Sequence, residues 1–118
     1  MRGFAIALLV ACAAGVSATP APLDPSQLVI LRDAAREALK PDCGKCHDSK
    51  LRTAKPAALK QFDLQEPDWS SHLSTDQLSH FAGRFEGFGV SDSRRNIVQT
   101  YLDAEKTRRG ASPSAAAR

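Results

Sequence analysis

Apolar side chains along residues 25–40 recur every three or four positions, which is the spacing of one face of a helix. This stripe comprises Leu28, Leu31, Ala35, Ala38 and Leu39. A start signal precedes it, because Asp24 suits the N-cap, Pro25 the first helical position and Gln27 the reciprocal place in a capping box. Pro41 has no N–H to donate within a helix, so we expect the helix to end there.

A second helix is predicted to begin at Ser74, because Gln77 stands three residues later and completes another capping box. Its buried face follows helical spacing and consists of Leu78, Phe81, Ala82 and Phe85. Gly87 and Gly89 come next and mark the end of this helix, since glycine readily adopts the backbone conformation that closes one.

The last predicted helix spans residues 93–108 and is capped by Ser91 or Ser93. Its buried face is predicted to contain Ile97, Val98, Tyr101 and Leu102. Its cationic side chains are expected in solvent, namely Arg94, Arg95, Lys106, Arg108 and Arg109. Residues 50–64 indicate a loop with one helical turn from Pro56, and no segment alternates in the manner of a strand. We therefore predict an all-α fold of three to four helices.

Residues 1–18 have the features of a signal peptide. Arg2 precedes an apolar stretch over residues 4–16, and a small-x-small pattern ends at Ala18. The stretch is shorter than the roughly 20 apolar residues that span a bilayer. We therefore expect a bacterial protein exported to the periplasm or the exterior. The remaining chain divides into a linker at 19–22, a single domain at 23–109 and a disordered tail at 110–118.

Cys12 gives the same leader a second interpretation. The apolar residues 9–11 precede it as in the lipobox of bacterial lipoproteins, whose cysteine becomes the lipidated first residue. Only a very short apolar core would precede this cysteine, however, and the chain stays apolar after it. We therefore favour cleavage near Thr19 and keep a membrane anchor at Cys12 as the alternative. Cleavage leaves only Cys43 and Cys46, so no disulfide framework is available to the mature protein.

Cys43 and Cys46 enclose two residues and His47 follows at once, which is the attachment pattern for c-type haem. Two thiols on one helical turn can each form a thioether with one haem vinyl group. The adjacent imidazole of His47 can then face the iron as its proximal ligand. We therefore predict that these three residues hold one covalent haem c.

Three other interpretations of the motif remain open. A structural zinc site would combine the two thiolates with His72 and His80, because His47 is too close in sequence to be a comfortable third ligand. A thioredoxin-like redox pair uses the same cysteine spacing, but within a βαβ pattern that does not surround this motif. A plain local disulfide is the third. The first and last of these would describe an interaction module without redox turnover.

The region around the motif is basic. Residues 40–60 carry six cations against Asp42 and Asp48, a formal balance of +4, whereas the whole chain of 118 residues stands at +3. The cations are Lys40, Lys45, Lys50, Arg52, Lys55 and Lys60. A basic surface beside a haem edge would steer an acidic redox partner into contact, with docking near Lys45, Lys50, Arg52 and Lys55. A solvated surface without a partner is the alternative. The slight overall basicity and the few aromatic residues argue against nucleic-acid binding.

A helix leading into the motif, a loop, a short helix and a terminal helix with an inner aromatic residue together resemble a small monohaem class I cytochrome c. The architectural likeness covers about residues 23–109, and only Cys43, Cys46 and His47 match the family specifically. The resemblance implies a fold wrapped around one haem, a crossing of the first and last helices, and electron transfer as the function. That family usually supplies a distal Met. Met1 is the single Met and leaves with the signal peptide, so that ligand is excluded.

The distal ligand therefore separates the functional hypotheses. His72 lies in the loop before the second helix, near Trp69, where it can turn towards a cofactor. His80 lies opposite the apolar stripe and is expected in solvent, so it is the least favoured of the candidate ligands, after His72 and a weak ligand such as a Lys or water. With His72 bound, the six-coordinate iron would serve a low-potential electron carrier. With the sixth position open or weakly ligated, it would bind a small gas or act as a weak peroxidase. Outside the motif there is no nucleophile–base pair and no phosphate-binding glycine loop, so we favour electron transfer over catalysis.

Overall fold

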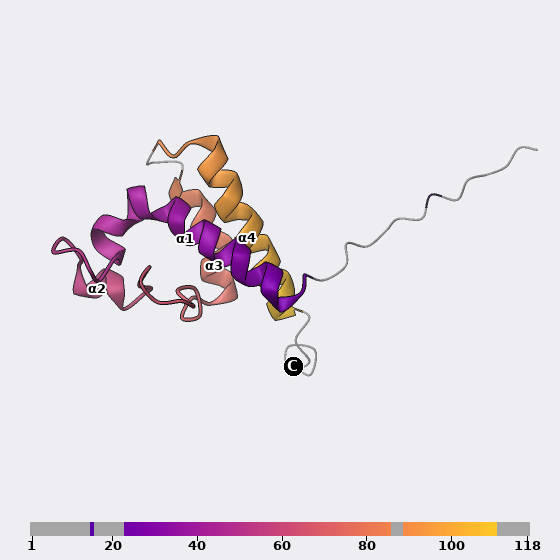
Figure 1. Ribbon diagram of the computed structural model, residues 1–118, viewed down its shortest axis with the longest axis horizontal. Helices are drawn as coiled ribbons and strands as arrows, with labels where there is room; N and C mark the ends of the chain where they lie inside the picture. The colour runs from indigo at the N-terminus through magenta and orange to yellow at the C-terminus, as the bar shows by residue number, and fades with distance from the viewer. Residues whose placement is uncertain (1–14, 16–22, 86–88, 111–118) are drawn as a thin grey trace, which may run out of the picture.

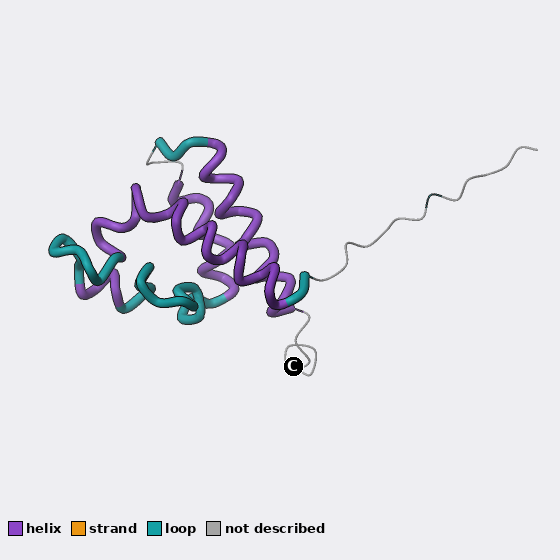
Figure 2. The backbone as a smooth tube through the Cα atoms, viewed as in Figure 1, coloured by secondary structure: helices purple, strands orange, loops and turns teal. Residues whose placement is uncertain are grey.

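Helices make up all the regular structure in the part of the chain that the computed structural model describes, which is residue 15, residues 23–85 and residues 89–110. In chain order these helices are α1 (Pro25–His47), α2 (Pro56–Leu59), α3 (Thr75–Phe81), the 3₁₀ helix η1 (Ala82–Phe85) and α4 (Asp92–Gly110). Figure 2 shows helices joined only by loops over these ranges, which confirms the predicted all-α fold class.

The predicted chain ends fall almost wholly outside the described residues. This applies to the signal peptide apart from Gly15, to Cys12, and to the linker at 19–22. It also applies to the predicted tail after Gly110, a residue that closes α4 instead of beginning the tail. Among the described residues, no helix is both long enough and apolar enough to cross a membrane.

The predicted capping boxes are confirmed at the starts of α1 and α3. The Asp24 carboxylate accepts from the backbone N–H of Gln27 at 3.0 Å, and the Gln27 side chain accepts from the backbone N–H of Asp24 at 3.3 Å. Ser74 and Gln77 make the same reciprocal pair at 3.1 and 2.8 Å. Each box satisfies two N–H groups that a helix start leaves without partners. The one-turn helix predicted from Pro56 is also present, as α2.

The prediction that the first helix ends at Pro41 is wrong, because α1 continues through Pro41 to His47. A proline inside a helix removes one backbone hydrogen bond and crowds the preceding turn, at a cost of about 3 kcal/mol. Loop residues distant in sequence bind the last carbonyl groups of α1. The backbone N–H of Lys55 donates to the Cys46 carbonyl at 3.1 Å, and that of Leu64 donates to the His47 carbonyl at 2.8 Å. Figure 1 shows α1 changing direction along its length and ending beside this loop.

The hydrophobic core lies where α1 and α4 pack against each other and against the segment that joins α2 to α3. Figure 1 shows α1 and α4 side by side, with the start of α1 near the end of α4. Trp69 is fully buried, and its ring lies 5.5 Å from that of Tyr101 and 5.8 Å from that of Phe62. These aromatic side chains tie the joining segment to α4.

The buried face of α4 differs from the prediction at two positions. Val98, Tyr101 and Leu102 are buried as expected, but Ile97 is 38% exposed. The stripe continues instead to Glu105, which is 4% exposed because it falls at the next position of the same helical face. Arg109, expected in solvent, is bound to Glu105 at 2.9 Å and donates to the Ser70 carbonyl at 3.1 Å. A charged pair therefore closes the C-terminal end of this interface.

Candidate functional site

The three residues of the haem-attachment pattern lie on the last turns of α1 and line one pocket of about 190 Å³. Both thiols are free and half-buried. The other walls of this pocket come from α1, from the loop before α3 and from α3 and η1, and they consist of Asp42, Phe62, Phe81, Arg84 and Phe85. The fold therefore presents Cys43, Cys46 and His47 to a single, mainly aromatic cavity, which we call the motif pocket.

His47 is held in one orientation by Phe62. Its Nδ1 lies 3.0 Å from the Phe62 carbonyl oxygen, and its ring stacks on the Phe62 ring with centroids 3.7 Å apart and planes 1° from parallel. A carbonyl oxygen only accepts hydrogen bonds, so Nδ1 is the donor in this contact, and in the neutral ring Nε2 is then the nitrogen with the lone pair. This is the arrangement by which proteins orient an imidazole that ligates a metal.

The loop that supplies Phe62 is itself fixed by Asp63. One carboxylate oxygen of Asp63 accepts from the backbone N–H groups of Ser49 at 3.2 Å and Gln65 at 2.9 Å. Desolvation opposes ionisation of Asp63, but these hydrogen bonds outweigh it and lower the pKa of the carboxyl group below its ordinary value. Asp63 is therefore ionised at neutral pH and keeps the loop closed against the end of α1.

The Cys43 thiol does not resemble that of a reactive redox pair. Burial, followed by the nearby Asp42 carboxylate and the Cys46 sulfur, raises the pKa of the Cys43 thiol above its ordinary value. Asp42 is itself bound to Arg94 at 2.7 Å, across from α1 to α4. Redox-active cysteines of the thioredoxin type have lowered pKa values. The environment of Cys43 therefore argues against that alternative.

The two remaining histidines do not line the motif pocket. His72 has a side chain that is 63% exposed and lies 3.4 Å from the Glu66 carboxylate. His80, predicted in solvent, is indeed 76% exposed, and its Nδ1 lies 2.8 Å from the Asp76 carbonyl oxygen. Neither histidine is placed with the two thiols, as the zinc hypothesis requires. Within the described ranges, no three His, Cys, Asp or Glu side chains gather closely enough to hold a metal ion.

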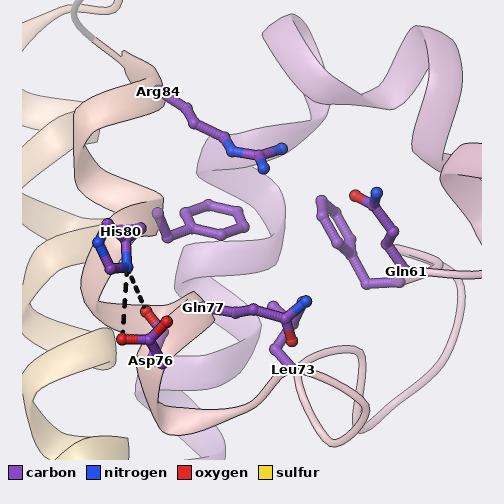
Figure 3. Close-up of a pocket in the computed structure, with 8 residues that line it drawn as sticks. Gln61, Leu73, Asp76, Gln77, His80 and Arg84 are labelled. Carbon is purple, nitrogen blue, oxygen red and sulfur yellow. Dashed lines mark hydrogen bonds and ion pairs between the residues drawn. The ribbon is translucent and has the colours of Figure 1, made fainter.

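A second pocket of about 190 Å³ adjoins the motif pocket and shares Phe62, Phe81 and Arg84 with it. Figure 3 shows this second pocket, with Gln61 on one wall and Gln77 and Arg84 on the other. Because the two pockets share three lining side chains, they are neighbours between the loop at 61–62 and the helices α3 and η1. We call the two pockets together the shared groove. No sequence pattern singles out Arg84, which occupies an ordinary polar position in the predicted helix.

Five cations of the basic segment are exposed beside the motif, namely Lys45, Lys50, Arg52, Lys55 and Lys60. None of them forms an ion pair with the described residues. Lys40 differs, because its ammonium group lies 2.7 Å from the Glu37 carboxylate. The surface around the motif therefore carries uncompensated positive charge.

Comparison of the chain with protein-family models, with curated proteins and with solved structures finds no match.

Proposed function

We propose that this protein is an exported c-type cytochrome that carries electrons through one haem, bound covalently at Cys43 and Cys46 and ligated by His47. The observation that carries the proposal is the convergence of two free thiols and an imidazole with an available Nε2 on one aromatic pocket. Each thiol would add across one vinyl double bond, with sulfur joining one carbon and hydrogen the other. Bound haem would supply one-electron chemistry, for which the protein provides attachment, orientation and a dry environment.

The size and lining of the shared groove support haem as the ligand. A cavity of about 190 Å³ is smaller than the roughly 300–1,000 Å³ of typical cofactor sites. Together with its neighbour of about 190 Å³, the motif pocket reaches the lower part of that range. Phe62, Phe81 and Phe85 would cover part of the macrocycle, while the rest would lie near the surface. An edge close to solvent suits electron exchange through a brief contact with another protein.

The available ligands favour a second candidate, a haem with an open sixth position that binds a small gas or acts as a weak peroxidase. Apart from His47, the described lining of the motif pocket contains no His, Met or Lys. His72, the proposed distal ligand of a low-potential carrier, faces Glu66 and would have to leave that carboxylate to reach the iron. Substitution of His72 by Ala tests this directly.

The exposed cations Lys45, Lys50, Arg52 and Lys55 support docking of an acidic redox partner. Such a contact would be small and short-lived, in the class of electron-transfer encounters. Attraction between opposite charges raises the association rate and is screened by salt. We therefore expect the electron-transfer rate with an acidic partner to fall as ionic strength rises. A rate independent of salt would remove this part of the proposal.

The optical spectrum of protein matured in a periplasm with haem-attachment machinery tests the proposed function. We expect a Soret band in the wild type and its reduction or loss in Cys43→Ser. Sharp α and β bands on reduction that disappear in His72→Ala would assign the electron carrier with His72 as ligand. A high-spin spectrum that shifts with carbon monoxide, unchanged by His72→Ala, would assign the open site. Absence of a Soret band, or zinc in its place, would reject the proposal in favour of an interaction module.

A further inference from the structure

The shared groove has two chemically different ends. The motif pocket is lined mainly by the two thiols and by aromatic rings, with Asp42 and Arg84 as its charged side chains. At the second pocket the walls carry polar and charged groups above an apolar floor, and these groups belong to Gln61, Asp76, Gln77, His80 and Arg84. An apolar ligand would gain nothing from the second end, since burying unpaired amides and a guanidinium is costly. The groove therefore suits a flat ligand with one apolar edge and one polar, anionic edge.

Haem has these two edges, because its vinyl groups lie on one side of the macrocycle and its two propionate groups on the other. Thioethers at Cys43 and Cys46 would fix the vinyl edge at the motif pocket. We propose that Arg84, Gln61 and Gln77 bind the propionate carboxylates at the opposite end of the groove. This inference rests on the proposed function and adds to it the residues that hold the polar edge.

Arg84 is the central residue of this propionate site. It lines both pockets, and its side chain extends into the space between the two walls in Figure 3. Arg84 forms no ion pair with the described residues, so its guanidinium is available for a carboxylate. Guanidinium groups bind carboxylates through two parallel N–H donors, which fixes both the position and the plane of the carboxylate.

Gln77 and Gln61 lie on opposite walls of the second pocket (Figure 3). The Oε1 atom of Gln77 accepts from the backbone N–H of Ser74 at 2.8 Å, which leaves its NH₂ group to donate to a ligand. Gln61 is exposed and offers a second amide donor. Together with Arg84 they provide donors from both sides of the groove, as two carboxylates require.

The other charged groups at the groove do not cancel the charge of Arg84. Asp76 has an 87% exposed side chain, and its carboxylate lies 3.7 Å from the His80 ring, so water screens it. Asp42, in the motif pocket, is bound to Arg94 at 2.7 Å. A positive charge beside haem favours the reduced form, because reduction removes one positive charge from the iron. Arg84 would therefore raise the reduction potential.

Two measurements on haem-loaded protein test the propionate site, with Lys106→Gln on α4 as the control for an equal charge change outside the groove. Arg84→Gln should lower the reduction potential by more than the control does, and Arg84→Lys should restore most of the difference. Difference infrared spectra with isotope-labelled propionates should show a shifted carboxylate band in Arg84→Gln and a smaller shift in Gln61→Leu.

The result that would overturn the inference is a haem of the expected mass in Arg84→Gln, with a potential shift no larger than in Lys106→Gln and an unchanged propionate band. The proposed function would survive that result, because attachment through the cysteines is measured separately by mass. Should Arg84→Gln fail to retain haem, Arg84→Lys and Gln61→Leu decide the question. Shifted propionate bands in these two variants support the site, and wild-type bands in both reject it.

Discussion

The two ends of the helical core differ in whether their polar groups are paired within the protein. At the C-terminal end of α4, Glu105 binds both Arg108 and Arg109, and the Tyr101 hydroxyl lies 2.5 Å from that of Ser70. The polar atoms there are paired within the protein. At the end of α1 the backbone is equally well fixed, but the Cys43 and Cys46 thiols are free and the Nε2 atom of His47 keeps its lone pair.

One end of the core therefore serves mainly stability and the other mainly function. Buried polar groups that are fully satisfied fix one conformation, and leaving one of them unpaired costs free energy. Donor atoms left available on a rigid turn can instead bind a ligand without reorganisation. We therefore expect substitutions at the α4 end to act mainly on stability. Substitutions of the motif should act mainly on cofactor attachment.

The largest effect on stability is expected for Glu105→Ala. Glu105 is 4% exposed, and its loss leaves Arg109 without its carboxylate partner. We expect the free energy of unfolding to fall by about 3 kcal/mol, as for other broken buried ion pairs. Chemical denaturation followed by circular dichroism measures this, with Glu105→Gln as the matched variant that keeps the side-chain shape. A loss as small as that of a surface substitution would contradict the claim that the paired groups at the end of α4 stabilise the fold.

The same pair gives the protein a pH dependence. Burial alone would raise the pKa of Glu105, but hydrogen bonds from Arg108 and Arg109 outweigh it and lower the pKa below the ordinary 4.5. The stabilisation by ionised Glu105 is therefore complete above the unfolded pKa and is lost as the pH falls through the folded one. We expect the stability difference between wild type and Glu105→Gln to shrink as the pH is lowered below about 4.5. Denaturation at several pH values tests this, and a difference that grows towards low pH would refute it.

A smaller loss is expected for Tyr101→Phe. The substitution keeps the ring packed against Trp69 but leaves the buried Ser70 hydroxyl without its partner. We expect the free energy of unfolding to fall by about 1–2 kcal/mol. The double variant Tyr101→Phe, Ser70→Ala should recover part of this loss, because it removes both polar groups. If the double variant loses the full sum of both single changes, the two hydroxyls are not coupled.

The smallest effect on stability is expected for Lys45→Gln at the end of α1. Lys45 is exposed in the last turn, where a cation interacts favourably with the helix dipole. We expect a loss of about 0.3 kcal/mol that decreases with added salt. Denaturation at low and high ionic strength measures it. A loss comparable to that of Glu105→Ala would show that the end of α1 carries as much stability as the end of α4.

The helix starts could be predicted because they depend on residues close together in the sequence. Asp24 with Gln27 and Ser74 with Gln77 are each three residues apart, and each pair forms as expected. The end of α1 could not be predicted in this way, because Pro41 signals a helix break in the local sequence. The partners of the last carbonyl groups of α1 come from residues 55 and 64, which only the folded loop brings there.

The candidate site also combines features that nearby residues determine with features that distant residues determine. The chemistry proposed for the motif was predicted from the spacing of Cys43, Cys46 and His47 alone. The orientation of His47 depends on the carbonyl of Phe62, fifteen positions away, and was not visible in any pattern. Arg84 likewise reaches the groove only because α3 and η1 pack opposite the loop at 61–62. Contacts that join distant segments are set by tertiary packing, which hydrophobic periodicity does not specify.

The mass of the mature, purified polypeptide tests the central claim most directly, because covalent attachment survives denaturation. Electrospray mass spectrometry under denaturing conditions should find the chain heavier than its amino acids by one haem. The double variant Cys43→Ser, Cys46→Ser should have the mass of its amino acids alone. A wild-type protein matured in the same cells without this added mass would contradict the claim that the end of α1 is a haem-attachment site.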